Sequence, residues 1–94
     1  MQSCGTHFVE FLFGRTRAGV LRILFMQPHA TLSAQELAQA ASLSVGSVYH
    51  ETRILSELGL LVAHPAGARL VRYQANHEHA DFPVLRQLLA RSAG

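Results

Sequence analysis

The polar side chains between Ser44 and Arg53 offer the clearest chemistry in this sequence. Serine, histidine and arginine follow one another there with small residues between them. Hydroxyl, imidazole and guanidinium groups form hydrogen bonds with the edges of DNA bases and with phosphate oxygens. No nucleophile, base and orienting group occur together in the 94 residues, and no glycine-rich phosphate loop is present. We therefore expect a binding protein rather than an enzyme, with no cofactor.

A helix over residues 44–58 is predicted to position these side chains. Ser44 can cap its start, and Gly59 ends it because the residue just past a helix commonly needs a left-handed backbone. Four residues recur three or four positions apart and are expected to face the core: Val45, Val48, Thr52 and Leu55. The rest of the helix surface carries the predicted DNA contacts: Ser44, Gly46, Ser47, Tyr49, His50 and Arg53.

The outward residues are expected to make different contacts in the major groove, which admits an α-helix and is read best by the start of that helix. Ser47 and His50 are predicted to reach base edges. Ser44 and the free amides beside it are expected to bind a phosphate oxygen. Arg53 is predicted to contact the backbone or a guanine. The alternative for each of these residues is a solvated helix surface.

The charges of the chain permit nucleic-acid binding without requiring it. The net charge is +2, and all eight basic residues are arginine, which can form paired hydrogen bonds with phosphate or guanine. Codon bias is the alternative explanation for the absence of lysine. Glu51 and Glu57 lie on the same helix as the predicted contacts, and phosphates repel carboxylates. Both are therefore expected to lie off the interface, in surface ion pairs.

A second, shorter helix is predicted ahead of residue 44. Ser33 can cap its start, and Glu36 three positions later can accept a hydrogen bond from the amide of Ser33, the reciprocal arrangement called a capping box. Two capped helices joined by a tight turn within about thirty residues indicate a helix-turn-helix.

Two extended runs after Gly59 predict a β-hairpin, over residues 60–64 and 69–75, with turn-forming residues between them. Gly67 permits the tight reversal, Arg69 lies at the tip, and Arg72 is predicted on the outer face. The hairpin over residues 61–75 is therefore expected to act as a wing, with Arg69 and Arg72 contacting the minor groove or the DNA backbone. The alternative is a solvated charge at a turn.

Apolar spacing predicts the remaining elements. A core helix covers residues 16–26, a short extended piece at 31–32 can pair with the hairpin, and an amphipathic helix covers 81–92. Residues 7–13 form a short apolar segment that Gly14 separates from the core helix. The predicted order is α-β-α-α-β-β-α, mainly α with a small β-hairpin, in a single α+β domain over residues 1–94. That order is typical of a winged helix-turn-helix.

The apolar content of the chain predicts a dimer. Hydrophobic residues make up 49% of the sequence, which is high for a domain that buries only a modest core. Two recognition helices about 34 Å apart would fit a roughly palindromic site in double-stranded DNA. The predicted interface comes from residues 7–13 and 81–92: Phe8, Phe11, Leu12, Phe82, Leu85 and Leu89. The alternative is that these side chains close the core of a monomer.

The sequence resembles winged-helix transcription regulators of the ArsR and MarR type. The residues that carry this resemblance are Leu37-Ala38, Ser44, Ser47-Val48, Leu55, Leu58-Gly59-Leu60, Gly67, Arg69 and Tyr73. The resemblance implies a cytoplasmic, homodimeric DNA-binding protein that regulates transcription, as a repressor. Ser42 departs from the pattern, because the turn between the two helices usually carries glycine, and a serine there must adopt a less favourable backbone conformation.

A closer resemblance is to the small winged-helix domains that precede a nucleotidyltransferase-like domain. It is carried by Phe13-Gly14, Arg17, Leu21, Leu24, Asn76, Phe82 and Leu85-Arg86, and the match covers about residues 11–92. This resemblance leaves open whether the chain is a freestanding regulator or part of a longer protein. It also implies the alternative function, a protein-interaction module that serves a partner or a following domain.

Other classes of site find less support in the sequence. Cys4 is the only cysteine, so no intrachain disulfide or two-cysteine metal site can form, and a reducing cytoplasmic setting is expected. No apolar run approaches the length of a membrane span, and the first residues do not form a secretion signal. His77, His79 and Asp81 offer ligands for zinc or nickel, but alternate ligands in a loop do not fix a coordination geometry, so no metal is predicted.

Overall fold

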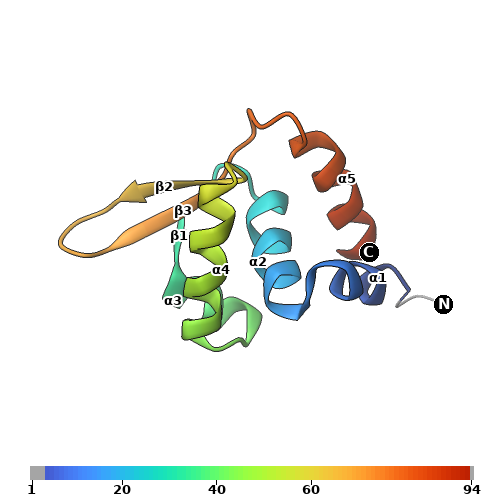
Figure 1. The fold of residues 1–94 in the computed structure, drawn as a ribbon, viewed down its shortest axis with the longest axis horizontal. Helices are drawn as coiled ribbons and strands as arrows, with labels where there is room; N and C mark the ends of the chain where they lie inside the picture. The colour runs from blue at the N-terminus through green and yellow to red at the C-terminus, as the bar shows by residue number, and fades with distance from the viewer. Residues whose placement is uncertain (1–3, 94) are drawn as a thin grey trace.

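The computed structural model describes the backbone of residues 4–93 and the side chains of residues 9–91. The elements in chain order are α1 (Cys4–Phe13), α2 (Arg15–Met26), β1 (Leu32–Ser33), α3 (Ala34–Ala41), α4 (Val45–Glu57), β2 (Leu61–Pro65), β3 (Val71–Ala75) and α5 (Phe82–Ala93). This part of the chain is therefore a mixed α+β fold, as predicted, with five helices and one antiparallel sheet (Figure 1). No helix within residues 4–93 is both long and apolar enough to cross a membrane.

The N-terminal segment differs from the prediction, because residues 7–13 belong to a helix of their own. Helix α1 ends where the Gly14 amide donates to the carbonyl of Glu10 at 2.7 Å, and Gly14 then adopts a φ of 87°. That positive φ is accessible to glycine at little cost and lets α2 begin at once in a new direction. Gly14 thus separates two helices, where the sequence pattern predicted only the start of one.

The sheet has the strand order β1-β3-β2, with both pairs antiparallel. Leu32 of β1 pairs with Tyr73, and β2 pairs along its whole length with β3, from Leu61 opposite Ala75 to Pro65 opposite Val71. The short extended piece and the hairpin are therefore confirmed, with strand ends within two residues of the predicted ones. The free end of the hairpin projects away from the helices, while its base lies beside α3 and α4 (Figure 1).

The core lies where α2 meets the other elements. Leu24 and Phe25 of α2 are fully buried, and the centroid of the Phe25 ring lies 5.1 Å from the centroid of the Phe82 ring of α5. Helices α1 and α5 pack against each other and against α2, at the end of the molecule opposite the hairpin (Figure 1). The buried apolar side chains are Val9, Ala18, Val20, Leu21, Leu24, Phe25, Leu37, Ala38, Val48, Leu55, Leu61, Tyr73, Ala75 and Leu89.

The predicted capped helix pair is present as α3 and α4. The Ser33 hydroxyl accepts from the Glu36 amide at 3.2 Å, and the Glu36 carboxylate accepts from the Ser33 amide at 2.9 Å, which completes the capping box. Ser42 ends α3 in the left-handed region with a φ of 57°, as its place in the turn required. Gly59 follows α4 with a φ of 81°, so the predicted glycine stop is confirmed.

Candidate nucleic-acid interface

The outward face of α4 is formed by exposed residues whose side chains do not pack in the core. Successive residues of a helix turn by about 100°, so Gly46, His50 and Arg53 share one stripe along it. All three are exposed, whereas Val48, Thr52 and Leu55 on the opposite side are buried. Neither His50 nor Arg53 forms a hydrogen bond or an ion pair with another residue that the structure describes. These polar groups are free to bind another molecule.

Val45 does not face the core, which corrects its predicted placement. Its side chain is 47% exposed. The helical angle places it at the edge of the buried stripe, on the side where Tyr49 lies one turn later. Tyr49 is 56% exposed, in agreement with its predicted position on the flank of the helix. An apolar and an aromatic side chain thus border the polar stripe on the side that faces the hairpin.

The start of α4 holds its two serines together. The Ser44 hydroxyl accepts from the Ser47 amide at 3.2 Å and donates to the Ser47 hydroxyl oxygen at 2.9 Å. The predicted cap is therefore confirmed, and both side chains remain exposed. The Ser47 hydroxyl keeps its own hydrogen for an external acceptor, while the contact with Ser44 fixes its orientation.

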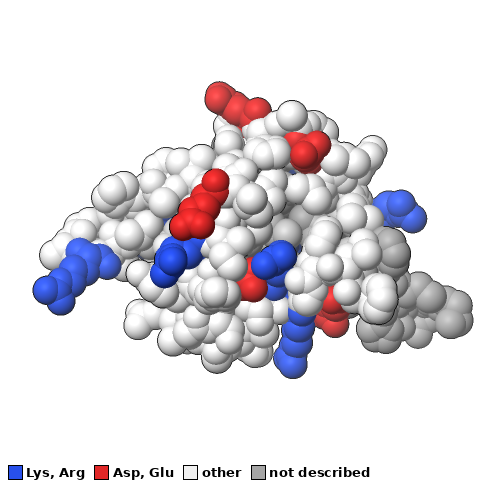
Figure 2. Space-filling view, viewed as in Figure 1, with Lys and Arg blue, Asp and Glu red and all other residues white. Residues whose placement is uncertain are grey.

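The hairpin turn carries one exposed arginine. The Ala66 amide donates to Leu70 at 2.9 Å, and the reversal between them uses Gly67 with a φ of 124° and Arg69 with a φ of 63°. Arg69 is exposed and forms no ion pair with any residue in the described range. Figure 2 shows basic atoms at the free end of the hairpin with no acidic atoms beside them in that view.

Arg72 has a different environment from the one predicted for it. Its Nη2 donates to the carbonyl oxygen of Thr31 and to Oε1 of Glu36, both at 2.8 Å, and its Nε donates to the Thr31 hydroxyl at 3.2 Å. These contacts hold the guanidinium against the start of α3 instead of leaving it on an outer face. Arg72 therefore positions the base of the hairpin. Its side chain stays partly exposed, so the predicted DNA contact is not tested by these bonds and stays a prediction.

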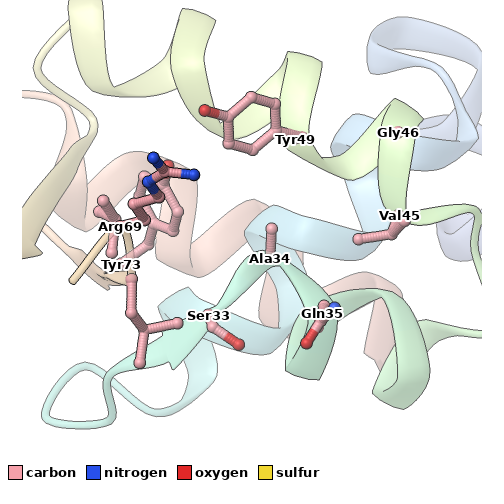
Figure 3. A pocket seen from close by; sticks show the side chains of 10 residues that line it. Ser33, Ala34, Gln35, Val45, Gly46, Tyr49, Arg69 and Tyr73 are labelled. Carbon is pink, nitrogen blue, oxygen red and sulfur yellow. The ribbon is translucent and has the colours of Figure 1, made fainter. Parts of the chain in front are cut away.

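A groove of about 390 Å³ separates α4 from the hairpin (Figure 3). Tyr49 and Arg69 lie along one side of it in this view, with the Tyr49 hydroxyl directed toward the hairpin, and Val45 and Ala34 lie across from them. Among the described residues that line the groove none is acidic, and Arg69 is the one that carries a formal charge. The residues that line the groove are Ser33, Ala34, Gln35, Val45, Gly46, Tyr49, Arg69, Leu70, Val71 and Tyr73.

Sequence reasoning missed part of this groove. Ala34, Gln35 and Leu70 were not among the predicted contacts, because they come from two other parts of the chain, the start of α3 and the hairpin turn. Leu70 is an exposed leucine beside Arg69, which is a weak signal for a contact surface. Nothing in the local pattern of residues 34 and 35 indicates that the start of α3 faces the hairpin.

Glu51 lies off the outward stripe, as predicted. Its carboxylate oxygen Oε1 lies 2.7 Å from Nε of Arg17 on α2, and the two side chains are partly buried between the helices. This ion pair neutralises Glu51 and links α4 to α2. Glu57 is exposed near the end of α4 and forms no ion pair within the described part of the chain, so the surface pair predicted for it is not seen there.

The residues predicted for a dimer interface fall into two groups. Phe11 and Leu12 on α1 are 84% and 49% exposed, so they are available to a partner. Phe82 and Leu85 are partly buried against the core, and Leu89 has no exposed surface. Leu89 therefore closes the core of its own chain and cannot contribute contact area to a partner, which corrects that prediction. The Phe8 side chain lies outside the described residues.

The loop before α5 offers no metal centre. The Asp81 amide donates to Nδ1 of His79 at 3.0 Å, and the His77 ring approaches the edge of Phe82 with 6.5 Å between the ring centroids. No group of three or more His, Cys, Asp or Glu side chains in the described part of the chain is placed to hold a metal ion. The alternative assignment of His77, His79 and Asp81 to a metal thus gains no geometric support.

A scan against models of known protein families finds no match to the chain, and a search of curated proteins finds no significant match. Function must therefore be inferred from the residues and geometry of the chain itself.

Proposed function

We propose that this chain is a winged-helix protein that binds double-stranded DNA as a homodimer and represses transcription. Helix α4 would enter the major groove, and the β2–β3 hairpin would act as the wing on the neighbouring minor groove. The observation that carries this proposal is the position of Arg69. It lies across one groove from the exposed start of α4, and no acidic residue lines the groove between them.

The outward stripe of α4 supports the major-groove contact. Gly46 and Ser47 are small, so the start of the helix can approach the bases closely, and His50 follows one turn later on the same exposed side. Arg53 lies a further turn along and can bind a phosphate or the O6 and N7 atoms of guanine. The Arg17–Glu51 pair keeps the Glu51 carboxylate turned toward α2, away from the phosphates. Glu57 lies on the outward stripe one turn after Arg53, so the DNA contacts are expected nearer the start of α4.

The free end of the hairpin supports the minor-groove contact. The electrostatic potential of DNA is most negative where the minor groove is narrow, and arginine side chains are attracted there. Arg69 is exposed at the turn, and its single positive charge can neutralise one phosphate group of the DNA backbone. Arg72 holds the base of the same hairpin through Thr31 and Glu36, so Arg69 is presented from a fixed support.

The exposed side chains of α1 support the dimer. Phe11 and Leu12 form an apolar surface at the end of the molecule opposite the hairpin. Joining two copies through this end would leave both α4 helices free for successive major grooves, about 34 Å apart. The binding site would then be roughly palindromic. Light scattering of the purified chain tests this directly, with Phe11→Ser expected to convert a dimer to a monomer.

The experiment that tests the proposal begins with selection of binding sites from a library of random duplexes. Fluorescence anisotropy then measures the affinity of each variant for the selected duplex across a range of salt concentrations. We expect Arg69→Ala to weaken binding about tenfold and to reduce the slope of log K against log salt by about 1. We expect His50→Ala to weaken binding about tenfold and to relax the sequence preference at one position.

Arg91→Ala is the matched control, because it removes the same charge from an exposed site near the end of α5. It is expected to leave binding within about twofold of the unmodified chain, since a screened distant charge contributes little. Unchanged binding in both Arg69→Ala and His50→Ala would overturn the proposed interface.

The apolar lining of the groove favours a second candidate function, a winged-helix module that docks a partner protein or a nucleotidyltransferase-like domain. Val45, Leu70 and Val71 would then meet apolar side chains of the partner. Such docking would depend only weakly on salt, whereas phosphate contacts weaken steeply as salt is added. Failure to select any duplex at low salt would favour this second function.

A further inference from the structure

Gly46 stands out among the glycines that the structure describes. Gly14, Gly59 and Gly67 have positive φ angles, and a Cβ at Gly19 would lie only 3.2 Å from the Leu43 side chain. Apart from its chain neighbours and the backbone of its own helix, a Cβ at Gly46 would meet no described atom within 4 Å, and the φ of Gly46 is not positive. Neither backbone conformation nor packing within the chain therefore requires glycine at this position.

Glycine at this position also has a cost. An exposed helical glycine destabilises a helix relative to alanine, because it loses more backbone entropy on folding. The chain thus carries an unfavourable residue on the exposed stripe of α4, one turn before His50. The described residues give no reason for the absence of a side chain there, whereas close approach of another molecule to the helix backbone would give one.

The side of Gly46 that faces the hairpin is mainly apolar. Val45 precedes it and Tyr49 follows one turn later, both are exposed, and all three residues line the groove between α4 and the hairpin. They form a shallow surface that we call the Gly46 notch, defined by Gly46, Val45 and Tyr49. On this side the notch suits a small apolar group, because Val45 is apolar and the Tyr49 hydroxyl is its only side-chain hydrogen-bonding group. The imidazole of His50 lies on the other side of Gly46, along the polar stripe.

We propose that the Gly46 notch receives the C5-methyl group of a thymine, so that the DNA site contains an A·T pair at that position. The thymine methyl is the one apolar group that bases present in the major groove. The positive charge of Arg69 and the absence of acidic residues from the described lining of the groove are compatible with the phosphates beside that base. This inference rests on the proposed function, because it requires α4 to lie in the major groove.

The test compares thymine with deoxyuridine, which differs from it only by the missing C5-methyl. Each thymine of the selected duplex is replaced in turn, and affinity is measured by fluorescence anisotropy at fixed salt. We expect replacement at one position in each half-site to weaken binding about fourfold, the value of one buried methyl group, while the other thymines serve as internal controls.

Gly46→Ala then fills the notch. We expect this variant to bind the thymine duplex about tenfold more weakly than the unmodified chain, and to bind the deoxyuridine duplex with nearly unchanged affinity. Its thermal midpoint should rise, because alanine is the better helix former and finds open space. A higher midpoint together with weaker binding excludes misfolding as the cause of the loss.

The outcomes separate the inference from the function on which it rests. Failure to bind any duplex overturns the proposed function itself. Binding that is insensitive to every thymine methyl overturns the notch and leaves DNA binding intact. An equal loss by Gly46→Ala on thymine and deoxyuridine duplexes also overturns it, because the added methyl would then clash with something other than the thymine. If Gly46→Ala binds both duplexes as tightly as the unmodified chain does, the notch is overturned as well.

Discussion

The two faces of α4 differ in what holds their side chains. On the inward face Val48, Thr52 and Leu55 are buried, and the Thr52 hydroxyl donates to the carbonyl of Tyr49 at 3.0 Å. On the outward face His50 and Arg53 are exposed and have no partner among the described residues. One helix thus carries positions that folding requires and positions that folding leaves unconstrained. The second set is where a binding function can be placed without loss of stability.

Leu55→Ala should give the largest effect, because it removes a fully buried side chain from the inward face. We expect the free energy of unfolding to fall by about 3 kcal/mol, from lost apolar burial and the cavity left behind. Urea denaturation followed by circular dichroism measures this change. A loss below about 1 kcal/mol would mean that the inward face is not part of a close-packed core.

Ser33→Ala and Ser44→Ala should each lower the free energy of unfolding by about 1 kcal/mol, because each removes a helix cap. The two caps should differ in their effect on binding. Ser44 starts the helix that carries the proposed contacts, so we expect its replacement to weaken DNA binding, while Ser33→Ala has a smaller effect. Paired denaturation and anisotropy measurements separate the two, and equal losses of binding would contradict a contact at Ser44.

Glu51→Gln tests the flank of the inward face, where α4 is linked to α2. We expect a loss of at most about 1 kcal/mol, because the pair with Arg17 is partly exposed to solvent. The loss should shrink as sodium chloride is added, since salt screens the pair. Glu57→Gln is the matched control and should change stability little at any salt concentration. A salt-independent loss would indicate packing rather than charge.

His50→Ala should give the smallest effect on stability, within about 0.5 kcal/mol, because an exposed side chain without partners contributes little. Denaturation of this variant beside Leu55→Ala completes the comparison of the two faces. A destabilisation of more than about 1 kcal/mol would show that the outward face also supports the fold.

The local features of the fold were predictable from the sequence. The caps at Ser33 and Ser44 and the stop at Gly59 depend on residues within a few positions of one another, so their signals survive in a short window. The hairpin was predictable for the same reason. Helix α1 was not recognised as a helix. An apolar run followed by glycine is equally consistent with an irregular segment before one helix and with the junction between two helices.

The candidate site was only partly predictable. The exposure of His50 and Arg53 follows from helical periodicity. Val45 lies at the edge of the buried stripe, where periodicity does not determine whether a side chain is buried or exposed. Arg72 was misplaced because its partners, Thr31 and Glu36, lie far back in the chain. Leu89 was misplaced because its apolar character fits a monomer core and a dimer interface equally well.

The Glu36 carboxylate accepts two hydrogen bonds on the same oxygen. Oε1 receives the Ser33 amide at the start of α3 and Nη2 of Arg72 at the base of the hairpin. The orientation of the hairpin relative to the helix pair is therefore coupled to a helix cap. Preorganised partners lose less conformational entropy when they associate, so a hairpin held in this way would favour slow dissociation of whatever it contacts.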